Sequence, residues 1–169
     1  MSTPQPATPA MLFDRLDRLA IAHKTISHPA VYTVEEAQAV RDDFPGGHSK
    51  NLFLRNKKGQ MWLITCEESL VIDLKALAIK LGAGRFSFAS TDRLMRYLGV
   101  IPGAVTPFAV LNDGQKAVHM VLDRQLLEHD VLNFHPLDNT QTTAISPNDL
   151  IRFLNDCNHP PQIIDLVAL

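Results

Sequence analysis

Cysteine is scarce in this sequence, and long apolar runs are missing from it. The two cysteines, Cys66 and Cys157, lie far apart and not at a metal-site spacing, so we expect two buried free thiols in a reducing cytoplasm. No apolar run approaches the length of a membrane span. Residues 1–10 lack the basic start and apolar core of a signal peptide. We therefore expect a cytoplasmic protein with no membrane partner.

Several familiar catalytic motifs are also missing. The sequence has no Gly-x-Ser-x-Gly elbow, no phosphate-binding Gly-x-x-x-x-Gly-Lys-Ser/Thr loop and no dinucleotide fingerprint. Four histidines have no ligand-like partner at a fixed spacing, so we expect no metal and no cofactor: His48, His119, His129 and His159. The groups that remain as candidates for chemistry are a lysine, backbone loops, one histidine and small hydroxyl residues. Such a set can orient a substrate and stabilise a developing oxyanion, which suffices to hydrolyse an activated ester.

Charge is small overall but unevenly distributed. The net charge of −2 over 169 residues argues weakly against a general nucleic-acid binder. Residues 50–100, however, hold nine Lys/Arg against four Asp/Glu. A local basic face could contact a polyanion even on a slightly acidic chain. Scattered solubilising charge explains the same distribution equally well.

Hydrophobic periodicity and turn residues predict one α+β domain over residues 8–169, after a disordered N-terminus at residues 1–7. Helical spacing and capping residues predict helices at 9–23, 33–40, 74–81, 91–98 and 147–156. Apolar runs predict short strands at 25–28, 51–55, 60–66, 86–88, 109–112, 117–122, 131–134 and 142–145. Two hairpins, at 51–66 and 109–122, imply a mixed, mostly antiparallel sheet of about seven strands with flanking helices. Residues 162–169 are predicted to be a tail.

The stretch 46–54 (GGHSKNLFL) is the first candidate for chemistry. Its glycines allow the backbone to bend and to approach a ligand. Its apolar end predicts a buried strand, so Lys50 would project from a rigid base. An ammonium with three donors suits a phosphate or a polarised carbonyl. A solvated lysine that caps a strand end is the simpler alternative.

Two later stretches are further candidates. Residues 103–107 (GAVTP) precede a predicted strand and could present backbone groups to a small ligand, because proline stiffens the loop and glycine permits close approach. An ordinary turn fits these residues too. His135 lies at a strand end before a proline and is followed by a polar run. It could take part in acid–base chemistry or bind a ligand, or it could be a structural histidine.

These stretches together resemble one family, the YbaK-type, prolyl-tRNA-synthetase-associated editing domain superfamily. Residues 50–54 are similar to its lysine-bearing strand, and residues 103–108 to its Gly-x-x-x-Pro loop. Residues 133–136 (NFHP), with Asn139, Thr142 and Thr143, resemble the late motif of the free-standing alanyl-tRNA(Pro) deacylase branch. Residues 28–37 (HPAVYTVEEA) fit the early segment of that branch. The resemblance runs from about residue 8 to residue 157.

The resemblance implies hydrolysis of alanine mischarged onto proline tRNA, with a pocket that excludes proline by size. It implies the acceptor end of tRNA(Pro), and possible contact with prolyl-tRNA synthetase, as partners, and no DNA. Lys50 would be the catalytic residue. The tRNA's terminal ribose hydroxyl would help to activate water, so no protein general base is required. The implied substrate-binding residues are Thr33, Asn51, Phe53, Gly103, Ala104, Val105, Thr106, Pro107, His135 and Asn139.

Other functions remain open at this stage. Relatives in the superfamily remove cysteine or serine, or act as domains inside a synthetase. A non-catalytic RNA- or DNA-binding module would bind without turnover, although the chain lacks interleaved aromatic and basic residues. A protein-interaction domain that has lost its site is the third alternative, and fold alone does not decide among them.

Overall fold

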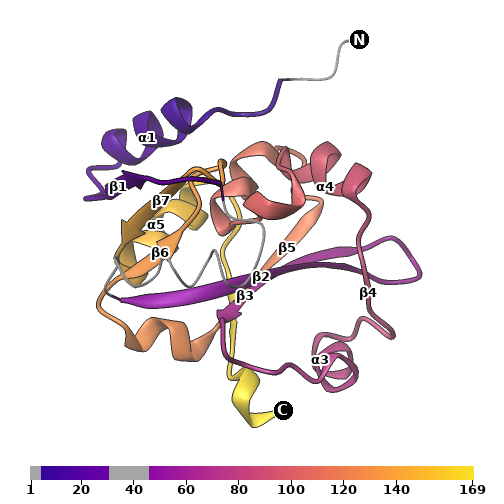
Figure 1. Ribbon diagram of the computed structural model, residues 1–169. Coiled ribbons are helices and arrows are strands. Elements are labelled where there is room, and N and C mark those ends of the chain that lie inside the picture. Colours follow the sequence, from indigo (N-terminus) through magenta and orange to yellow (C-terminus); the bar gives the residue numbers. More distant parts are fainter. Residues whose placement is uncertain (1–4, 31–45) are drawn as a thin grey trace.

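Helices and short strands alternate along the chain in the computed structural model, which describes residues 5–30 and 46–169 (Figure 1). The α-helices are α1 (Pro9–Arg18), α3 (Leu74–Leu81), α4 (Thr91–Leu98) and α5 (Pro147–Asp156). The strands are β1 (Lys24–Ser27), β2 (Gly47–Arg55), β3 (Met61–Glu67), β4 (Ser87–Phe88), β5 (Val118–Asp123), β6 (Leu132–Phe134), β7 (Gln141–Ile145) and β8 (Gln162–Ile164). Short 3₁₀ helices lie between them: η1 (Pro102–Ala104), η2 (Pro107–Asn112), η3 (Arg124–Glu128) and η4 (Leu166–Ala168). The helix predicted at 33–40 lies outside the described residues.

The strands form one eight-stranded mixed sheet in the order β1-β7-β6-β2-β3-β5-β8, with β4 paired to β2 beside this path. Antiparallel pairs join β1 to β7, β7 to β6, β2 to β3 and β2 to β4. Parallel pairs join β2 to β6, β3 to β5 and β5 to β8. The predicted α+β class with a mixed, mostly antiparallel sheet is confirmed. The described chain has eight strands, among them β8 from the predicted tail, whereas the predicted strand at 109–112 is not formed.

The predicted hairpin at 51–66 is present, and its first strand starts earlier than expected. β2 begins at Gly47, directly after a turn at Gly46 with φ +107°. A side chain at Gly46 would meet the Val131 carbonyl oxygen at 2.6 Å from its Cβ, so this turn requires glycine. β2 then pairs with β3 from Ser49 opposite Glu67 to Arg55 opposite Met61.

The predicted helix caps in the described chain are observed. The side chains of Thr8, Asp73, Ser90 and Ser146 each accept a backbone N–H from the first turn of the helix that follows. Helix α1 ends at Arg18 rather than near residue 23. Ala20 there adopts a left-handed φ of +56°, and Ile21 N–H donates to the Leu16 carbonyl at 2.9 Å, which closes the helix.

The second predicted hairpin is wrong. Residues 107–112 form the 3₁₀ helix η2 instead of a strand, and β5 pairs in parallel with β3. The apolar run at 108–110 is buried as part of a 3₁₀ helix and not as a strand of the sheet, and periodicity alone cannot distinguish the two. Asp113 occupies the predicted turn, where its carboxylate accepts the backbone N–H groups of Ala117 and Val118 at 3.1 and 2.8 Å.

The sequence predicts disorder at residues 1–7, and residues 1–4 lie outside the described chain. Within the rest, Ala7 N–H donates to Asn112 Oδ1 at 2.7 Å. This bond fixes the segment before α1 against η2.

Two hydrophobic cores lie on opposite faces of the central strands. Figure 1 shows α1 and α4 on one side of β2 and β3, and α3 on the other side. The first core joins α1, α4, η2 and α5 to the sheet, with Phe108 packed edge-on against Phe134 and Phe153 at ring distances of 5.8 and 5.4 Å. The second core packs α3 onto Leu54, Trp62 and Ile64. β2 and β3 supply both cores because alternate side chains point to opposite faces.

A buried ion pair joins the turn between η2 and β5 to the segment that follows α5. His159 Nε2 donates to Asp113 Oδ2 at 2.9 Å, and both side chains are 2% exposed. His159 Nδ1 donates to the Cys157 carbonyl at 2.7 Å, so both ring nitrogens face acceptors, as in an imidazolium. Burial alone would raise the pKa of Asp113, but hydrogen bonds from His159, Val118 and Ala117 bring this pKa below its ordinary value.

We expect Asp113→Asn to lower the free energy of unfolding at pH 7 by about 2–4 kcal/mol, because it removes one partner of a buried charged pair. A lowered carboxyl pKa stabilises the fold above about pH 4, and this stability is lost as the pH falls through the lowered value. The variant should lose that part of the pH dependence. Urea unfolding from pH 7 to pH 3 measures both effects.

Asp156→Asn is the matched control, because Asp156 pairs with Arg15 at the surface and is 38% exposed. Its stability should change by less than about 1 kcal/mol. Equal losses in the two variants would contradict the role assigned to the buried pair.

Candidate functional site

The edge of β2 that faces away from β3 is paired only in part. β6 pairs with its first residues, Gly47 and His48, and β4 pairs with its last, Leu54 and Arg55. Gly47 N–H donates to the Val131 carbonyl at 2.8 Å, and the Phe53 carbonyl accepts from Ala89 N–H at 2.9 Å. Backbone groups of alternate residues face the same edge. The backbone groups of residues 49 and 51 therefore face the stretch between β6 and β4.

The 103–107 loop is attached to this stretch by the side chain of Asn51. Asn51 Nδ2 donates to the Val105 carbonyl at 3.1 Å, and Thr65 Oγ1 donates to Asn51 Oδ1 at 2.6 Å. Thr65 is fully buried in β3. Since a carbonyl only accepts, these bonds fix the amide orientation. The sequence-predicted residues Asn51 and Val105 are thus brought together.

The remaining loop residues are held from within. Ala104, Thr106 and Pro107 are buried, and Gly103 is half-buried. Thr106 Oγ1 accepts from Phe108 N–H at 3.3 Å and caps η2. The loop therefore leads into a 3₁₀ helix and not into the predicted strand. Phe53 is 6% exposed and belongs to the same core as Phe108, beneath the loop.

Lys50 points to the opposite face of β2 from Asn51. Its Nζ donates to the Leu70 carbonyl, and it is half-buried. Cys66 lies directly opposite Lys50 on β3. Burial raises the pKa of the Cys66 thiol to about 12, although the Lys50 charge acts in the other direction. The structure thus places Asn51 against the 103–107 loop and the Lys50 ammonium away from it.

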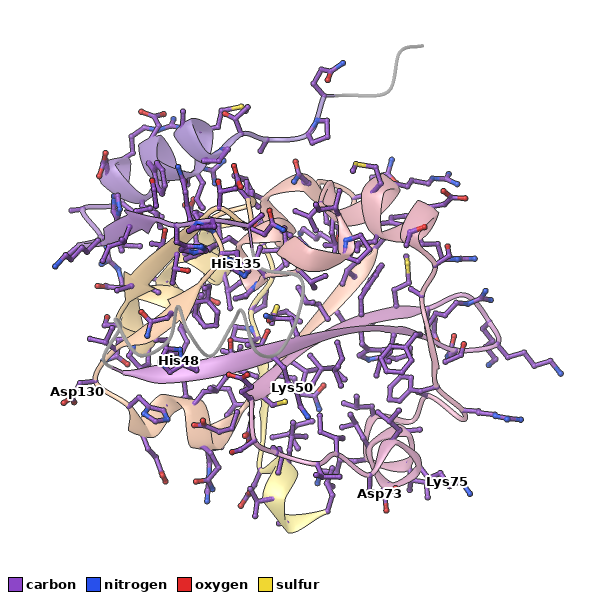
Figure 2. The ribbon with its side chains drawn as sticks, viewed as in Figure 1. His48, Lys50, Asp73, Lys75, Asp130 and His135 are labelled. Atoms are coloured by element: carbon purple, nitrogen blue, oxygen red, sulfur yellow. The ribbon has the colours of Figure 1, made fainter. Side chains whose placement is uncertain are left out.

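His135 directly follows β6, which pairs in parallel with the start of β2. This pairing sets His48 beside Asn133, and Lys50 and His135 each follow two residues later. β6 ends at Phe134, and the two strands separate there. Figure 2 shows Lys50 on β2 and His135 beyond the end of β6, apart from each other.

His135 is held in one tautomer. Its Nδ1 lies 2.8 Å from the Gln141 carbonyl oxygen and must donate to it, so Nε2 of the neutral ring is an acceptor. Burial lowers the pKa of His135, and neighbouring His28 lowers it further, whereas the Gln141 carbonyl and Asp138 act in the opposite direction. The ring is therefore neutral at pH 7, with a lone pair available on Nε2.

His28 joins this cluster, although the sequence analysis assigned it no role. Its ring centre lies 6.1 Å from that of His135. Its Nδ1 donates to the Pro29 carbonyl, and its Nε2 accepts from the Thr142 hydroxyl, each at 2.8 Å. The two histidines are far apart in the chain and meet only because β1, β7 and β6 are adjacent strands. Each directly precedes a proline, and His28 begins the 28–37 segment that carries part of the family resemblance.

Asn139, a few residues after His135 in the chain, has a buried side chain that can donate hydrogen bonds. It is 5% exposed, and its Nδ2 has no hydrogen-bond partner among the described residues. An unsatisfied buried donor costs about 1–3 kcal/mol, so it marks a place where a ligand acceptor would be stabilised. Thr33, also predicted to bind substrate, lies outside the described residues.

A separate cavity of about 500 Å³ opens on the β1–β7–β6 side of the molecule. It lies around Lys24 and Ala144, at the opposite end of the β1–β7 pair from Gln141. Its lining is mostly apolar and includes none of the predicted site residues. The chemistry of the candidate site therefore does not depend on it.

Among the described residues, the site has hydrogen-bonding groups but no activated nucleophile. Burial raises the pKa of Cys157 to about 11, so neither thiol ionises near pH 7. Residues 5–30 and 46–169 contain no group of three or more His, Cys, Asp or Glu that could hold a metal, and no helix among them is long and apolar enough to span a membrane. The arrangement can orient an ester and a water molecule.

Comparison with known proteins gives consistent matches. The model of a family described as the aminoacyl-tRNA editing domain matches residues 28–153. The chain is 39% identical over 153 residues to the prolyl-tRNA editing protein ProX of Acetoanaerobium sticklandii, covering 90% of this chain and 93% of that protein. It is 39% identical over 162 residues to the prolyl-tRNA synthetase associated domain-containing protein 1 of Bos taurus, covering 92% and 94%. A solved structure of a candidate trans-editing enzyme for prolyl-tRNA synthetase superposes with a TM-score of 0.72 at 20% identity, covering 95% and 97%.

We expect Asn51 and Thr65 to stabilise the protein as one coupled unit. Asn51→Ala and Thr65→Val should each lower the free energy of unfolding, and the double variant should lose about 1 kcal/mol less than their sum, because either change already breaks the chain to Val105. Urea unfolding of the four proteins measures this coupling. Thr65→Ser keeps the hydroxyl, so the coupling between residues 51 and 65 should persist in that variant. Additive effects of Asn51→Ala and Thr65→Val would contradict the network.

Proposed function

Because this chain belongs to the aminoacyl-tRNA editing domain family, it is a hydrolase of aminoacyl-tRNA esters, and we propose that it acts in trans on alanine mischarged onto tRNA(Pro). The names of the relatives refer to prolyl-tRNA editing or to prolyl-tRNA synthetase, and the choice of tRNA(Pro) in this proposal rests on them. The alanine specificity rests on the resemblance of residues 133–143 to the alanyl-tRNA(Pro) deacylase branch. The observation that carries the proposal is a set of oriented, uncharged hydrogen-bonding groups without an ionisable thiol.

The 103–107 loop holds the amino acid in this mechanism. Its backbone N–H and C=O groups bind the alanyl group and polarise the ester carbonyl, and Asn51 keeps the loop at a fixed distance from β2. Rigid donors aimed at a developing oxyanion lower the barrier most, because they need no reorganisation during the reaction. Phe53 supports the loop from the core and limits the size of the pocket.

Lys50 and His135 act on the other parts of the substrate. Lys50 leaves the Leu70 carbonyl to contact a phosphate at the tRNA 3′ end and thereby places the ester. The neutral Nε2 of His135 accepts a hydrogen bond from the substrate, and Asn139 Nδ2 donates one. The free hydroxyl of the terminal ribose helps to activate the attacking water. Hydrolysis then releases alanine and leaves the tRNA intact.

A second site is needed because one pocket separates alanine from proline poorly. A synthetic site built for proline cannot strongly reject a smaller side chain, since a lost methylene changes binding by only about 1–3 kcal/mol. A site that admits alanine and is too small for proline removes the error by size. Prolyl-tRNA synthetase, which makes the mischarged ester, is the partner that this division of labour implies.

We expect single-turnover hydrolysis of Ala-tRNA(Pro) and no hydrolysis of Pro-tRNA(Pro). Lys50→Ala should slow the reaction by about 10²-fold or more, because a misplaced ester loses that much rate. Lys116→Ala, at an exposed lysine on the β5 side, is the control and should keep the wild-type rate.

Cys-tRNA and Ser-tRNA substrates belong in the same assay. Faster release of cysteine or serine than of alanine would assign the protein to a sister branch of the family. Binding of tRNA without release of any amino acid would instead support a non-catalytic module.

We expect the deacylation rate to fall on the acid side of the pH profile as His135 becomes protonated. Because the pKa of His135 is lowered, its neutral form persists below pH 6.5, the ordinary histidine value. The rate should therefore hold at pH 6.5 and decline only at lower pH. His135→Gln should be slower and lack this decline, whereas an unchanged profile would exclude His135 from the reaction. Single-turnover rates from pH 5 to pH 8 provide the test.

A further inference from the structure

The tip of the β2–β3 hairpin is fastened to the segment between α3 and β4. Asn56 is 4% exposed, and its Nδ2 donates to the Ala83 carbonyl at 3.1 Å. The same side chain closes the hairpin turn, because its Oδ1 accepts from Gln60 N–H at 2.8 Å. Trp62 and Phe86 add an edge-to-face contact at 5.1 Å. Residues far apart in the chain therefore share one rigid surface, seen at the right of Figure 1.

This surface carries positive charge without compensation. Neither residues 50–66 nor residues 74–91 contain an aspartate or glutamate. The exposed cations on these segments define what we call the hairpin patch, namely Lys57, Lys58, Lys75, Lys80 and Arg85. No member of the hairpin patch forms an ion pair with another described residue, whereas Arg15, Arg18, Arg124 and Arg152 elsewhere each do. Figure 2 shows Lys75 extending outward from α3.

Among the described residues, the acids that flank residues 74–91 in the chain, Asp73 and Asp92, form no ion pair with the hairpin patch. Asp73 caps α3, where its Oδ1 accepts two backbone N–H groups at 3.1 Å. Asp92 lies in the first turn of α4. Phe88, which pairs with Leu54 on β2, carries an exposed aromatic ring and is 64% exposed. Uncompensated cations and an exposed aromatic ring on paired segments match the chemistry of a nucleic acid better than that of an acidic protein surface.

The hairpin also sets the distance between the patch and the candidate site. Lys50 and Lys57 lie on one continuous strand and its turn. A rise of about 3.3 Å per strand residue puts Arg55, the end of β2, roughly 17 Å from Lys50, and Lys57 follows in the turn. This length spans several nucleotides. An RNA whose 3′ end reaches Lys50 would thus extend its paired stem along the hairpin.

We propose that the hairpin patch binds the acceptor-stem phosphates of the tRNA whose 3′ ester lies at Lys50. The inference rests on the proposed function and adds the surface that holds the rest of the substrate. Contacts of this kind depend on charge and not on base sequence. They contribute to binding of the whole tRNA and not to the chemical step at the ester.

The test compares Lys57→Glu/Lys58→Glu with Lys24→Glu/Lys116→Glu, a matched pair of exposed lysines outside the patch. Fluorescence anisotropy measures the Kd of uncharged tRNA(Pro) between 50 and 200 mM NaCl. The patch variant should bind at least about tenfold more weakly at the lowest salt and show a salt slope smaller by about one to two. The control variant should bind like the wild type. An unchanged Kd for the patch variant would overturn the proposal and favour a protein partner.

Deacylation assays separate this proposal from the proposed function. The patch variant should raise KM for Ala-tRNA(Pro) by about the same factor, keep kcat, and cleave the alanyl ester of a CCA trinucleotide at the wild-type rate. Loss of activity on the trinucleotide would place the patch residues in the chemistry and contradict the proposal. Absence of hydrolysis by the wild type would refute the enzyme function, and the anisotropy result would still decide whether the patch binds RNA.

Discussion

The hydrogen-bonding edges of strand β2 are the constraint on which the rest of the structure depends. β3 occupies one edge of β2 along most of its length, whereas β6 and β4 share the other edge and leave a stretch between them. A backbone group buried without a partner is costly. The 103–107 loop lies against this stretch through the Asn51 side chain. The interruption that weakens the sheet locally is therefore also what gives the loop its place.

Two asparagines perform equivalent tasks, Asn51 in the middle of β2 and Asn56 just beyond its end. Asn51 donates to the Val105 carbonyl and Asn56 donates to the Ala83 carbonyl, each at 3.1 Å. Each side chain also accepts a hydrogen bond through its Oδ1, which fixes its amide orientation. A buried side-chain amide can join a strand to a neighbouring loop without adding a charge. One strand thus connects the proposed chemical site to the proposed RNA surface.

The chemistry of the proposed site depends on neutrality. Burial keeps both thiols protonated and His135 unprotonated, so Lys50 supplies the charge among the predicted site residues, and the Asp138 carboxylate lies close enough to His135 to act on its pKa. Hydrolysis of an aminoacyl ester suits such a site, because the ester is already activated and the terminal ribose supplies a hydroxyl. In the proposed mechanism, specificity comes from the shape and rigidity of the loop and not from a reactive residue.

Local patterns in the sequence determined much of the fold. Capping residues and helical spacing located α1, α3, α4 and α5, and the Lys57-Lys58-Gly59 turn located the β2–β3 hairpin, because these features depend on neighbours a few residues away. The same reasoning failed at residues 109–112. An apolar run there is buried in either conformation, and the Asp113 carboxylate that shapes the turn is held by distant His159.

The candidate site divides in the same way. The sequence by itself selected Lys50, Asn51, residues 103–107, His135 and Asn139 through motifs whose residues are close together in the chain. Only the tertiary structure decided that Asn51 and not Lys50 contacts the loop, because alternation along β2 sends neighbouring side chains to opposite faces. It also decided that His28 lies beside His135, since strand pairing between β1, β7 and β6 brings together residues that no local pattern connects.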